Sequence, residues 1–331
     1  MLRFVQCGIA AAVALAGALL APPAFAVDAV KVGFVAGLWD APTILANKNG
    51  YFKDAGIEVT LVRFGNAVDA GQALSVGQID ALPTLVVPGL LNASMRGINV
   101  KGVASAGENL PGYGNISLVL RKSLIDEGKY KGPADLGGLT LATAQNSSAH
   151  WFIAELAKTG NVDIAKVKVI SVGLPNIIAG MNNGAIDGGS VIEPFATMMV
   201  EKGQGVRVAT IDKSFPNFPA AYLWYGDSLL KNEALATRFL TAFIRGLRAY
   251  KAGVKDGVHS EELLALLVAN EIPATKQTTA LGFTDDAKIS TQHLDRYLEW
   301  VVSTGAMRQA PNIAGALDDR FRVEALKALA K

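Results

Sequence analysis

The chain has 331 residues, of which 50% are hydrophobic and 18% are charged, and its 31 basic and 29 acidic residues give a formal net charge of +2. This length exceeds a typical single domain of about 100–200 residues, and the high apolar content excludes a disordered chain. The balanced charge argues against a nucleic-acid partner and against an anionic membrane surface, because both require a strongly basic patch. We therefore expect two globular lobes that bind neither.

The first 26 residues have the pattern of a cleaved secretory signal peptide. Arg3 precedes an apolar run from Ile9 to Ala21, which is shorter than the about 20 residues that a bilayer-spanning helix needs. Ala26 then ends a small-x-small cleavage motif. We expect a periplasmic mature protein that is not embedded in a membrane. Because the single cysteine, Cys7, leaves with the leader, the mature chain would have no disulfide, cysteine nucleophile or thiolate metal site.

Strands and helices alternate along most of the remaining chain, which predicts parallel βα units and doubly wound sheets. The predicted strands are apolar and rich in β-branched residues, and they cover residues 29–36, 57–64, 79–82, 100–105, 139–143, 167–172, 186–191 and 220–225. The predicted helices cover residues 42–52, 68–76, 84–96, 147–159, 175–183, 194–202, 235–252, 260–270 and 289–304. The last third of the chain is therefore expected to be mostly helical.

The two sets of predicted elements have the same register. The shift that carries Gly77 onto Gly184 also carries Asp80 onto Asp187 and most strands onto strands, which predicts two similar lobes. Segments rich in turn residues at 107–114 and 214–219 would connect them. We expect the signal peptide at 1–26, the first part of lobe 1 at 27–113, lobe 2 at 114–219, and the return to lobe 1 with C-terminal helices at 220–331.

Several short motifs follow one another in a fixed order between about residues 30 and 251. They are Ala41-Pro42, NGYFKDAGIEV at 49–59, SVGQID at 75–80, DLGG at 135–138, SSAH at 147–150, GAID at 184–187 and Glu193-Pro194. Together they resemble the extracytoplasmic solute-binding proteins of ABC importers, in the branch that binds sulfonates, taurine, nitrate and thiamine-precursor pyrimidines. The resemblance implies an α/β, two-lobed periplasmic-binding-protein fold of the type II kind, with two parallel-rich sheets and a two-segment hinge. It also implies a ligand between the lobes and an ABC permease with its ATPase subunit as partner.

Candidate ligand-binding residues are those expected after the carboxyl ends of the strands, where open parallel sheets bind ligands, or near the return crossing. They are Trp39, Asp40, Asn66, Thr84, Ser105, Asn146, Ser147, Ser148, Glu193 and Trp224. Residues 146–148 precede a helix and would either hold an oxyanion at its N-terminus or simply cap it. Asp40 and Glu193 would either cap the helices that follow them or neutralise a ligand cation. Trp39 would either contact the ligand in the cleft or pack in the core, and Trp224 would either border the cleft or pack in the hinge.

No Lys or Arg stands in these loops, so an anionic ligand group would be held by amide and hydroxyl donors. Asp40 and Glu193 would supply acceptors, which favours a small organic sulfonate or carboxylate, including a zwitterion such as taurine. The alternatives are a neutral pyrimidine-like heterocycle stacked on Trp39, an exported enzyme and a receptor-linked sensor. The three histidines have no metal-ligand spacing, and neither a phosphate loop nor a nucleophile elbow is present. We therefore expect no catalytic residues, no metal and no cofactor.

Overall fold

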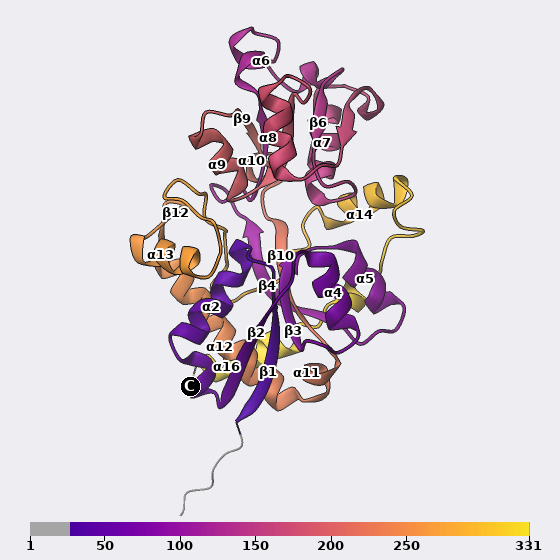
Figure 1. The fold of residues 1–331 in the computed structure, drawn as a ribbon. Coiled ribbons are helices and arrows are strands. Elements are labelled where there is room, and N and C mark those ends of the chain that lie inside the picture. Colours follow the sequence, from indigo (N-terminus) through magenta and orange to yellow (C-terminus); the bar gives the residue numbers. More distant parts are fainter. Residues whose placement is uncertain (1–26, 331) are drawn as a thin grey trace, which may run out of the picture.

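The computed structural model describes residues 27–330, so the expected signal peptide with Cys7 and its cleavage site lies outside the described residues. Two five-stranded sheets form two lobes, one above the other in Figure 1. The first has the order β2-β1-β3-β10-β4, with β1 Asp28–Phe34, β2 Ile57–Arg63, β3 Ala81–Leu85, β4 Lys101–Asn109 and β10 Phe218–Tyr225. The second has the order β7-β6-β8-β5-β9, with β5 Ile116–Leu120, β6 Thr140–Ala142, β7 Lys168–Ile170, β8 Gly188–Ile192 and β9 Val206–Thr210.

Each sheet has three parallel strands at one edge and one antiparallel strand beside them, β10 in the first and β5 in the second. This confirms the expected α/β fold with two parallel-rich sheets. The strands predicted from the sequence do not include β5 or β9. In the chain, β5 follows β4 of the first lobe, and β10 follows β9 and α10 of the second lobe. The chain therefore crosses between the lobes just before each of these antiparallel strands.

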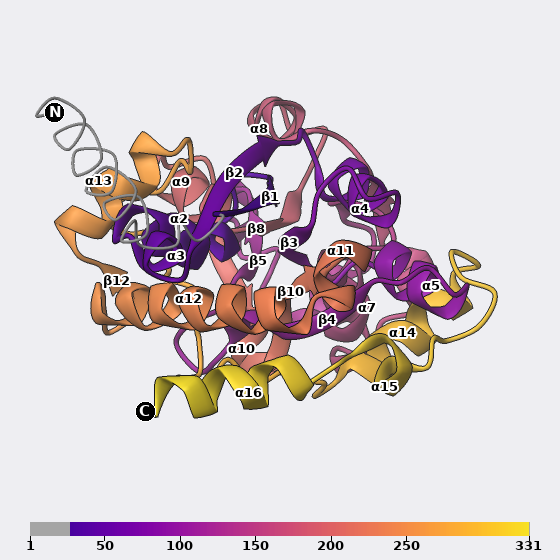
Figure 2. The same cartoon turned by 90° about the horizontal axis from the view of Figure 1, so that it is seen from below.

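Helices surround both sheets (Figures 1 and 2). In the first lobe and the C-terminal part they are η1 Leu38–Asp40, α2 Ala41–Lys48, α3 Tyr51–Asp54, α4 Ala67–Ser75, α5 Pro88–Met95, α11 Asp227–Lys231, α12 Glu233–Ala252, α13 Glu261–Ala269, α14 Leu294–Ser303, α15 Ile313–Ala316 and α16 Arg320–Leu329. In the second lobe they are α6 Lys122–Asp126, η2 Pro133–Leu136, α7 Ser148–Thr159, η3 Ile164–Lys166, α8 Leu174–Asn182, α9 Phe195–Glu201 and α10 Ile211–Ser214. A hairpin of β11 Val254–Lys255 and β12 Val258–His259 precedes α13. Across residues 27–330, no helix is both long and apolar enough to cross a membrane.

The structural repeat predicted from the register is present. The shift that carries Gly77 onto Gly184 carries α4 onto α8 and β3 onto β8 with the same bounds. Asp80 accepts the Lys31 N–H of β1 at 2.7 Å, and Asp187 accepts the Thr140 N–H of β6 at 2.8 Å. These equivalent contacts give both aspartates a structural role, because each ties a turn to the neighbouring parallel strand.

Asn109 joins the two segments that connect the lobes. It ends β4 and pairs with Phe218, the first residue of β10. Its Nδ2 donates to the Phe218 carbonyl at 2.9 Å, and its Oδ1 accepts the Asn115 N–H at 2.8 Å. Both strands extend into the segments expected to be loops, because residues 107–109 pair with β10. The crossings proper are therefore shorter than expected.

The C-terminal helices contact both lobes. In the first lobe, α12 packs against α2, and α16 lies beside α12 (Figure 2). By contrast, α14 packs against α7 of the second lobe, where the rings of Tyr297 and Trp151 are 5.9 Å apart and those of Trp300 and His150 are 4.8 Å apart. The chain then returns to the first lobe through α15, which contacts α5. The lobe boundaries at residues 113 and 219 stay predictions, and the contact of α14 with the second lobe is not indicated by the sequence.

Candidate functional site

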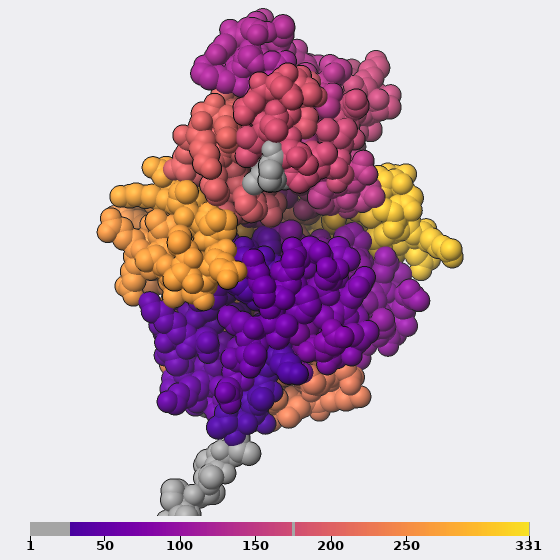
Figure 3. Space-filling model, in the orientation of Figure 1, coloured from indigo at the N-terminus to yellow at the C-terminus, as the bar shows by residue number. Residues whose placement is uncertain are grey.

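A pocket of about 800 Å³ lies between the lobes, beside α4, α5 and α14. In Figure 3 the surface is hollowed between the indigo-to-purple first lobe and the magenta second lobe. The first lobe contributes Ala67, Val68, Gly71, Gln72, Ser75, Val76, Leu85, Val86, Val87, Pro88, Gly89, Leu90, Asn92, Ala93, Arg96 and Ile98. The second lobe contributes Ala144, Gln145, Asn146, Ser147 and Ser148, and α14 contributes Tyr297. A cavity of this size is in the range that holds a small organic molecule.

The start of α7 forms the polar end of this pocket. Ser147 is the N-cap: its Oγ accepts the His150 N–H at 3.3 Å and donates to the Ala144 carbonyl at 2.5 Å. Asn146 adopts a left-handed backbone conformation with φ of 58°, and its N–H donates to Nδ1 of His150 at 3.2 Å. The first amides of a helix have no intrahelical acceptor, so those of Ser148 and Ala149 are available to a ligand. The structure thus brings residues 146–148 to the pocket, and their contact with a ligand stays a prediction.

Asn66 lies next to the pocket but is already used as a helix cap. Its Oδ1 accepts the N–H groups of Val68 and Asp69, both at 2.9 Å, at the start of α4. The side chain is exposed, while the following residue, Ala67, lines the pocket. Asn66 therefore caps the N-terminus of α4, and its Nδ2 donates to Asp69 Oδ2 at 2.9 Å.

Trp39 and Asp40 are buried in the first lobe and do not line the pocket. Asp40 occupies the N-cap position of α2, but its side chain makes no capping hydrogen bond there; its Oδ2 instead accepts the Gly37 N–H at 2.9 Å. Burial raises the pKa of Asp40 to about 8, against the opposing effects of the Gly37 and Val35 N–H groups and the Arg63 charge. At neutral pH the carboxyl group is therefore mostly protonated.

Thr84, Ser105 and Trp224 lie inside strands of the first sheet rather than in loops at their ends. Each is fully buried: Thr84 pairs with Tyr222 across β3 and β10, and Ser105 donates its N–H to the Ala287 carbonyl at 2.8 Å. The expected loop positions of Thr84 and Ser105 are wrong because β3 and β4 are longer than the apolar pattern indicates. Trp224 is buried in the hydrophobic core and does not line the pocket.

Glu193 is fully buried and paired with a residue that the sequence pattern does not single out. Its Oε1 lies 2.6 Å from an Nη of Arg207 on β9, and its Oε2 accepts the Thr197 N–H of α9 at 3.2 Å. Burial raises the pKa of Glu193, and the Arg207 charge opposes this effect. Arg207 also donates to Thr279 Oγ1 at 3.2 Å, which joins the second lobe to the C-terminal segment. Glu193 is thus a helix-capping and ion-pairing residue that lies outside the pocket lining.

Arg96 is the one charged side chain among the described residues that line the pocket. It is exposed and follows the end of α5. Sequence reasoning missed it because it considered only the ends of strands, whereas the pocket continues along the length of α4 and α5. The helical spacing of Gly89, Ala93 and Arg96 is the signal that would have placed Arg96 on the same face of α5 as the pocket.

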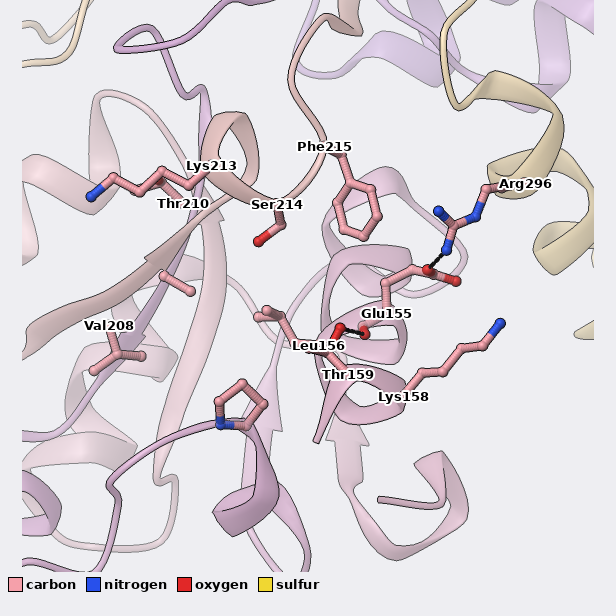
Figure 4. A pocket seen from close by; sticks show the side chains of 12 residues that line it. Glu155, Leu156, Lys158, Thr159, Val208, Thr210, Lys213, Ser214, Phe215 and Arg296 are labelled. Carbon is pink, nitrogen blue, oxygen red and sulfur yellow. Dashed lines mark hydrogen bonds and ion pairs between the residues drawn. The ribbon is translucent and has the colours of Figure 1, made fainter. Parts of the chain in front are cut away.

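A second cavity of about 560 Å³ lies on the second lobe, between α7, the β9–α10 segment and α14. Figure 4 shows Glu155 pointing toward Arg296, with which it forms an ion pair, and Lys213 and Lys158 on opposite sides. None of the candidate residues lines this cavity. Within residues 27–330, no group of three or more His, Asp or Glu side chains is arranged to hold a metal ion.

Comparison with known proteins assigns the family. A family model described as NMT1-like matches residues 24–261. The chain belongs to the NMT1-like family. A search of curated proteins found no match.

Solved structures share the fold of this NMT1-like protein. The periplasmic aliphatic sulphonate binding protein SsuA from Escherichia coli is 15% identical with a TM-score of 0.67, over 88% of this chain and 92% of that chain. The periplasmic nitrate-binding protein NrtA from Synechocystis PCC 6803 is 16% identical with a TM-score of 0.70, over 92% of this chain and 89% of that chain. The desulfurization enzyme DszB is 13% identical with a TM-score of 0.63, over 91% of this chain and 99% of that chain. These likenesses confirm the two-lobed periplasmic-binding-protein fold.

Proposed function

We propose that this NMT1-like protein is the periplasmic substrate-binding component of an ABC importer. It captures a small organic anion in the interlobe pocket and delivers it to a membrane permease with its ATPase subunit. The observation that carries the proposal is the composition of the pocket, which combines apolar walls, the free amides at the start of α7 and a single cation, Arg96, with no carboxylate in its lining. Both lobes contribute to it, so a ligand would hold them together.

The charges of the pocket favour a simple anion over a zwitterion. A ligand ammonium group would need a carboxylate partner, and Asp40 and Glu193 both lie outside the lining. Taurine is therefore a weaker candidate than an alkyl sulfonate or a carboxylate. A heterocycle stacked on Trp39 is also disfavoured, since that ring is buried among core residues of the first lobe.

The chemistry of the lining supports binding rather than catalysis. Ser147 donates its hydroxyl proton to a backbone carbonyl, and the nearby Nδ1 of His150 accepts a backbone N–H. Neither group is therefore free to act as a nucleophile and base in this arrangement. The desulfurization enzyme shares the fold. The sole cysteine of this chain, Cys7, lies in the expected signal peptide, so the mature protein would have no cysteine nucleophile.

A thermal-shift screen tests the proposal. Alkyl sulfonates and carboxylates should raise the melting temperature more than taurine, nitrate or a pyrimidine, because ligand at about 100 times its dissociation constant adds roughly 2.7 kcal/mol of stability. Arg96→Ala should weaken binding about fivefold, since a hydrogen bond to a charged group is worth about 1.5–3 kcal/mol when well formed and less when exposed. Arg308→Ala, which removes an exposed cation outside the pocket, is the control. No shift with any organic anion would overturn the proposal.

A further inference from the structure

The first-lobe side of the pocket is an apolar wall that runs along two helices. On α4 and its C-cap, Ala67, Val68, Gly71, Ser75 and Val76 recur at the spacing that keeps residues on one helix face. At a rise of 1.5 Å per residue this face is about 13 Å long. On α5, Gly89 and Ala93 form the corresponding row, and the cation Arg96 follows at the C-terminal end of the helix.

Large aliphatic side chains on this wall are open to solvent. Val68 is 62% exposed, Val76 is 71% exposed and Ile98 is 38% exposed. Of the eight large hydrophobic residues that are exposed in the described chain, these three line the pocket. Scattered exposed valines are ordinary on a surface, but apolar residues gathered in a concave pocket indicate a site for an apolar group.

The two helices pack closely where Gly71 meets Leu90 of α5. A Cβ on Gly71 would lie 3.4 Å from Leu90 Cγ, which is an ordinary van der Waals contact, and both residues are buried. The wall is therefore a closed apolar surface between α4 and α5.

The two sides of the pocket differ in polarity, although Gln72, Ser75, Asn92 and Arg96 are polar residues on the first-lobe side. The loop before α7 supplies Gln145, Asn146 and the two serines, while the first lobe supplies mostly aliphatic groups. An inorganic oxyanion would engage only the polar end and leave the wall in water. A ligand that covers both ends needs a polar head and a hydrocarbon body.

We propose that the wall formed by α4 and α5 selects organic acids by the length of their hydrocarbon tail, an inference that rests on the proposed function. The tail lies along Val68, Gly71 and Val76 while the acidic head faces the second lobe. The preferred ligand class is an alkyl or aryl sulfonate or carboxylate with a body of several carbons, and nitrate and two-carbon acids bind weakly.

Titration calorimetry with unbranched alkanesulfonates from ethanesulfonate to octanesulfonate tests this inference, with alkanecarboxylates of the same lengths as a second series. Affinity should rise about fourfold for each added methylene, which corresponds to about 0.8 kcal/mol per buried CH₂. The Val68→Thr/Val76→Thr double variant keeps the shape of the wall and makes it more polar. It should weaken octanesulfonate about fivefold and leave ethanesulfonate within twofold. The matched control is Val268→Thr/Val323→Thr, which changes exposed valines outside the pocket and should leave both affinities unchanged.

The outcomes separate the inference from the function on which it rests. Equal affinities for short and long members, or an equal loss for both in the Val68→Thr/Val76→Thr variant, would overturn tail selection while leaving the binding function in place. If no member of either series binds, the proposed function fails, and tail selection fails with it. If affinity rises with chain length in the parent protein and rises less steeply in the Val68→Thr/Val76→Thr variant, the result supports both the binding function and tail selection.

Discussion

Replacing Arg207 by Met should lower the free energy of unfolding by about 3 kcal/mol, because it leaves the fully buried carboxylate of Glu193 without its cation. Removal of one member of a buried ion pair costs about 3–5 kcal/mol, and the partial exposure of Arg207 places this case at the lower end. The loss should grow as the pH rises, because the pKa of Glu193 is already raised by burial and would rise further without the guanidinium. Urea denaturation at several pH values measures both effects.

The control for this prediction is the Glu193→Gln/Arg207→Met double variant. It removes both charges, and the amide still accepts the Thr197 N–H, so most of the lost stability should return. A double variant as unstable as Arg207→Met would mean that the loss comes instead from the hydrogen bonds of Arg207 with Thr197 and Thr279. An Arg207→Met protein within 1 kcal/mol of the parent would contradict the assigned role of the ion pair.

Asp40→Asn should change the free energy of unfolding, relative to the parent, in a pH-dependent way. The change should be more stabilising at pH 8 than at pH 5, by at least about 2 kcal/mol. Burial raises the pKa of Asp40 to about 8 from its ordinary value of 3.8, so the folded state keeps a proton that the unfolded state has already lost. Folding stability therefore falls as the pH rises between these two values, by up to about 1.4 kcal/mol per pH unit, and levels off above the higher one. Asparagine is neutral throughout and still accepts the Gly37 N–H, so this part of the decline disappears.

Equilibrium unfolding across this pH range checks the prediction for Asp40. Part of the decline should persist in the variant, because burial also raises the pKa of Glu108 to about 7. Asp80→Asn is the matched control for removal of a carboxylate that accepts a backbone N–H. Stability curves of the parent and Asp40→Asn that run parallel from pH 5 to pH 8 would show that Asp40 is ionised in the folded protein.

Much of the fold follows from local sequence signals. The apolar, β-branched runs locate β1, β2, β3 and β8, and the matching register of the two halves predicts the duplicated topology that both sheets show. Ser147 is a helix cap in the structure, as serine before a helical pattern favours. These features depend on neighbouring residues in the chain, which is why a single sequence predicts them.

The features that the sequence does not predict depend on contacts between distant segments. The predicted strands omit β5 and β9, although ISLVL of β5 and VRVAT of β9 are typical strand sequences. Their antiparallel pairing in the second sheet depends on distant segments. The docking of α14 on α7 depends on aromatic contacts such as Trp151 with Tyr297, whose residues are far apart in the chain. Asp40 and Glu193 have the residue types of ligand contacts, but only the fold shows that both are buried outside the pocket.

The lining of the pocket could also be predicted from the sequence only in part. The rule that ligands bind at the carboxyl ends of strands led to residues 146–148, which do line it. It did not lead to Arg96 or to the valines of α4, because these lie along helices whose packing leaves a space between the lobes. The difference in polarity between the two sides of the pocket is a property of the assembled lobes, and it narrows the expected ligand from a small organic anion or zwitterion to an amphipathic organic acid.

The most direct test of the binding function is a crystal structure of the protein grown with the organic anion that gives the largest thermal shift. We expect ligand density between the two lobes, with the acidic group within hydrogen-bond distance of the Ser148 or Ala149 amide and the hydrocarbon body against Val68 and Val76. Density for the ligand only in the cavity between α7 and the β9–α10 segment, or only on an outer face of one lobe, would contradict it.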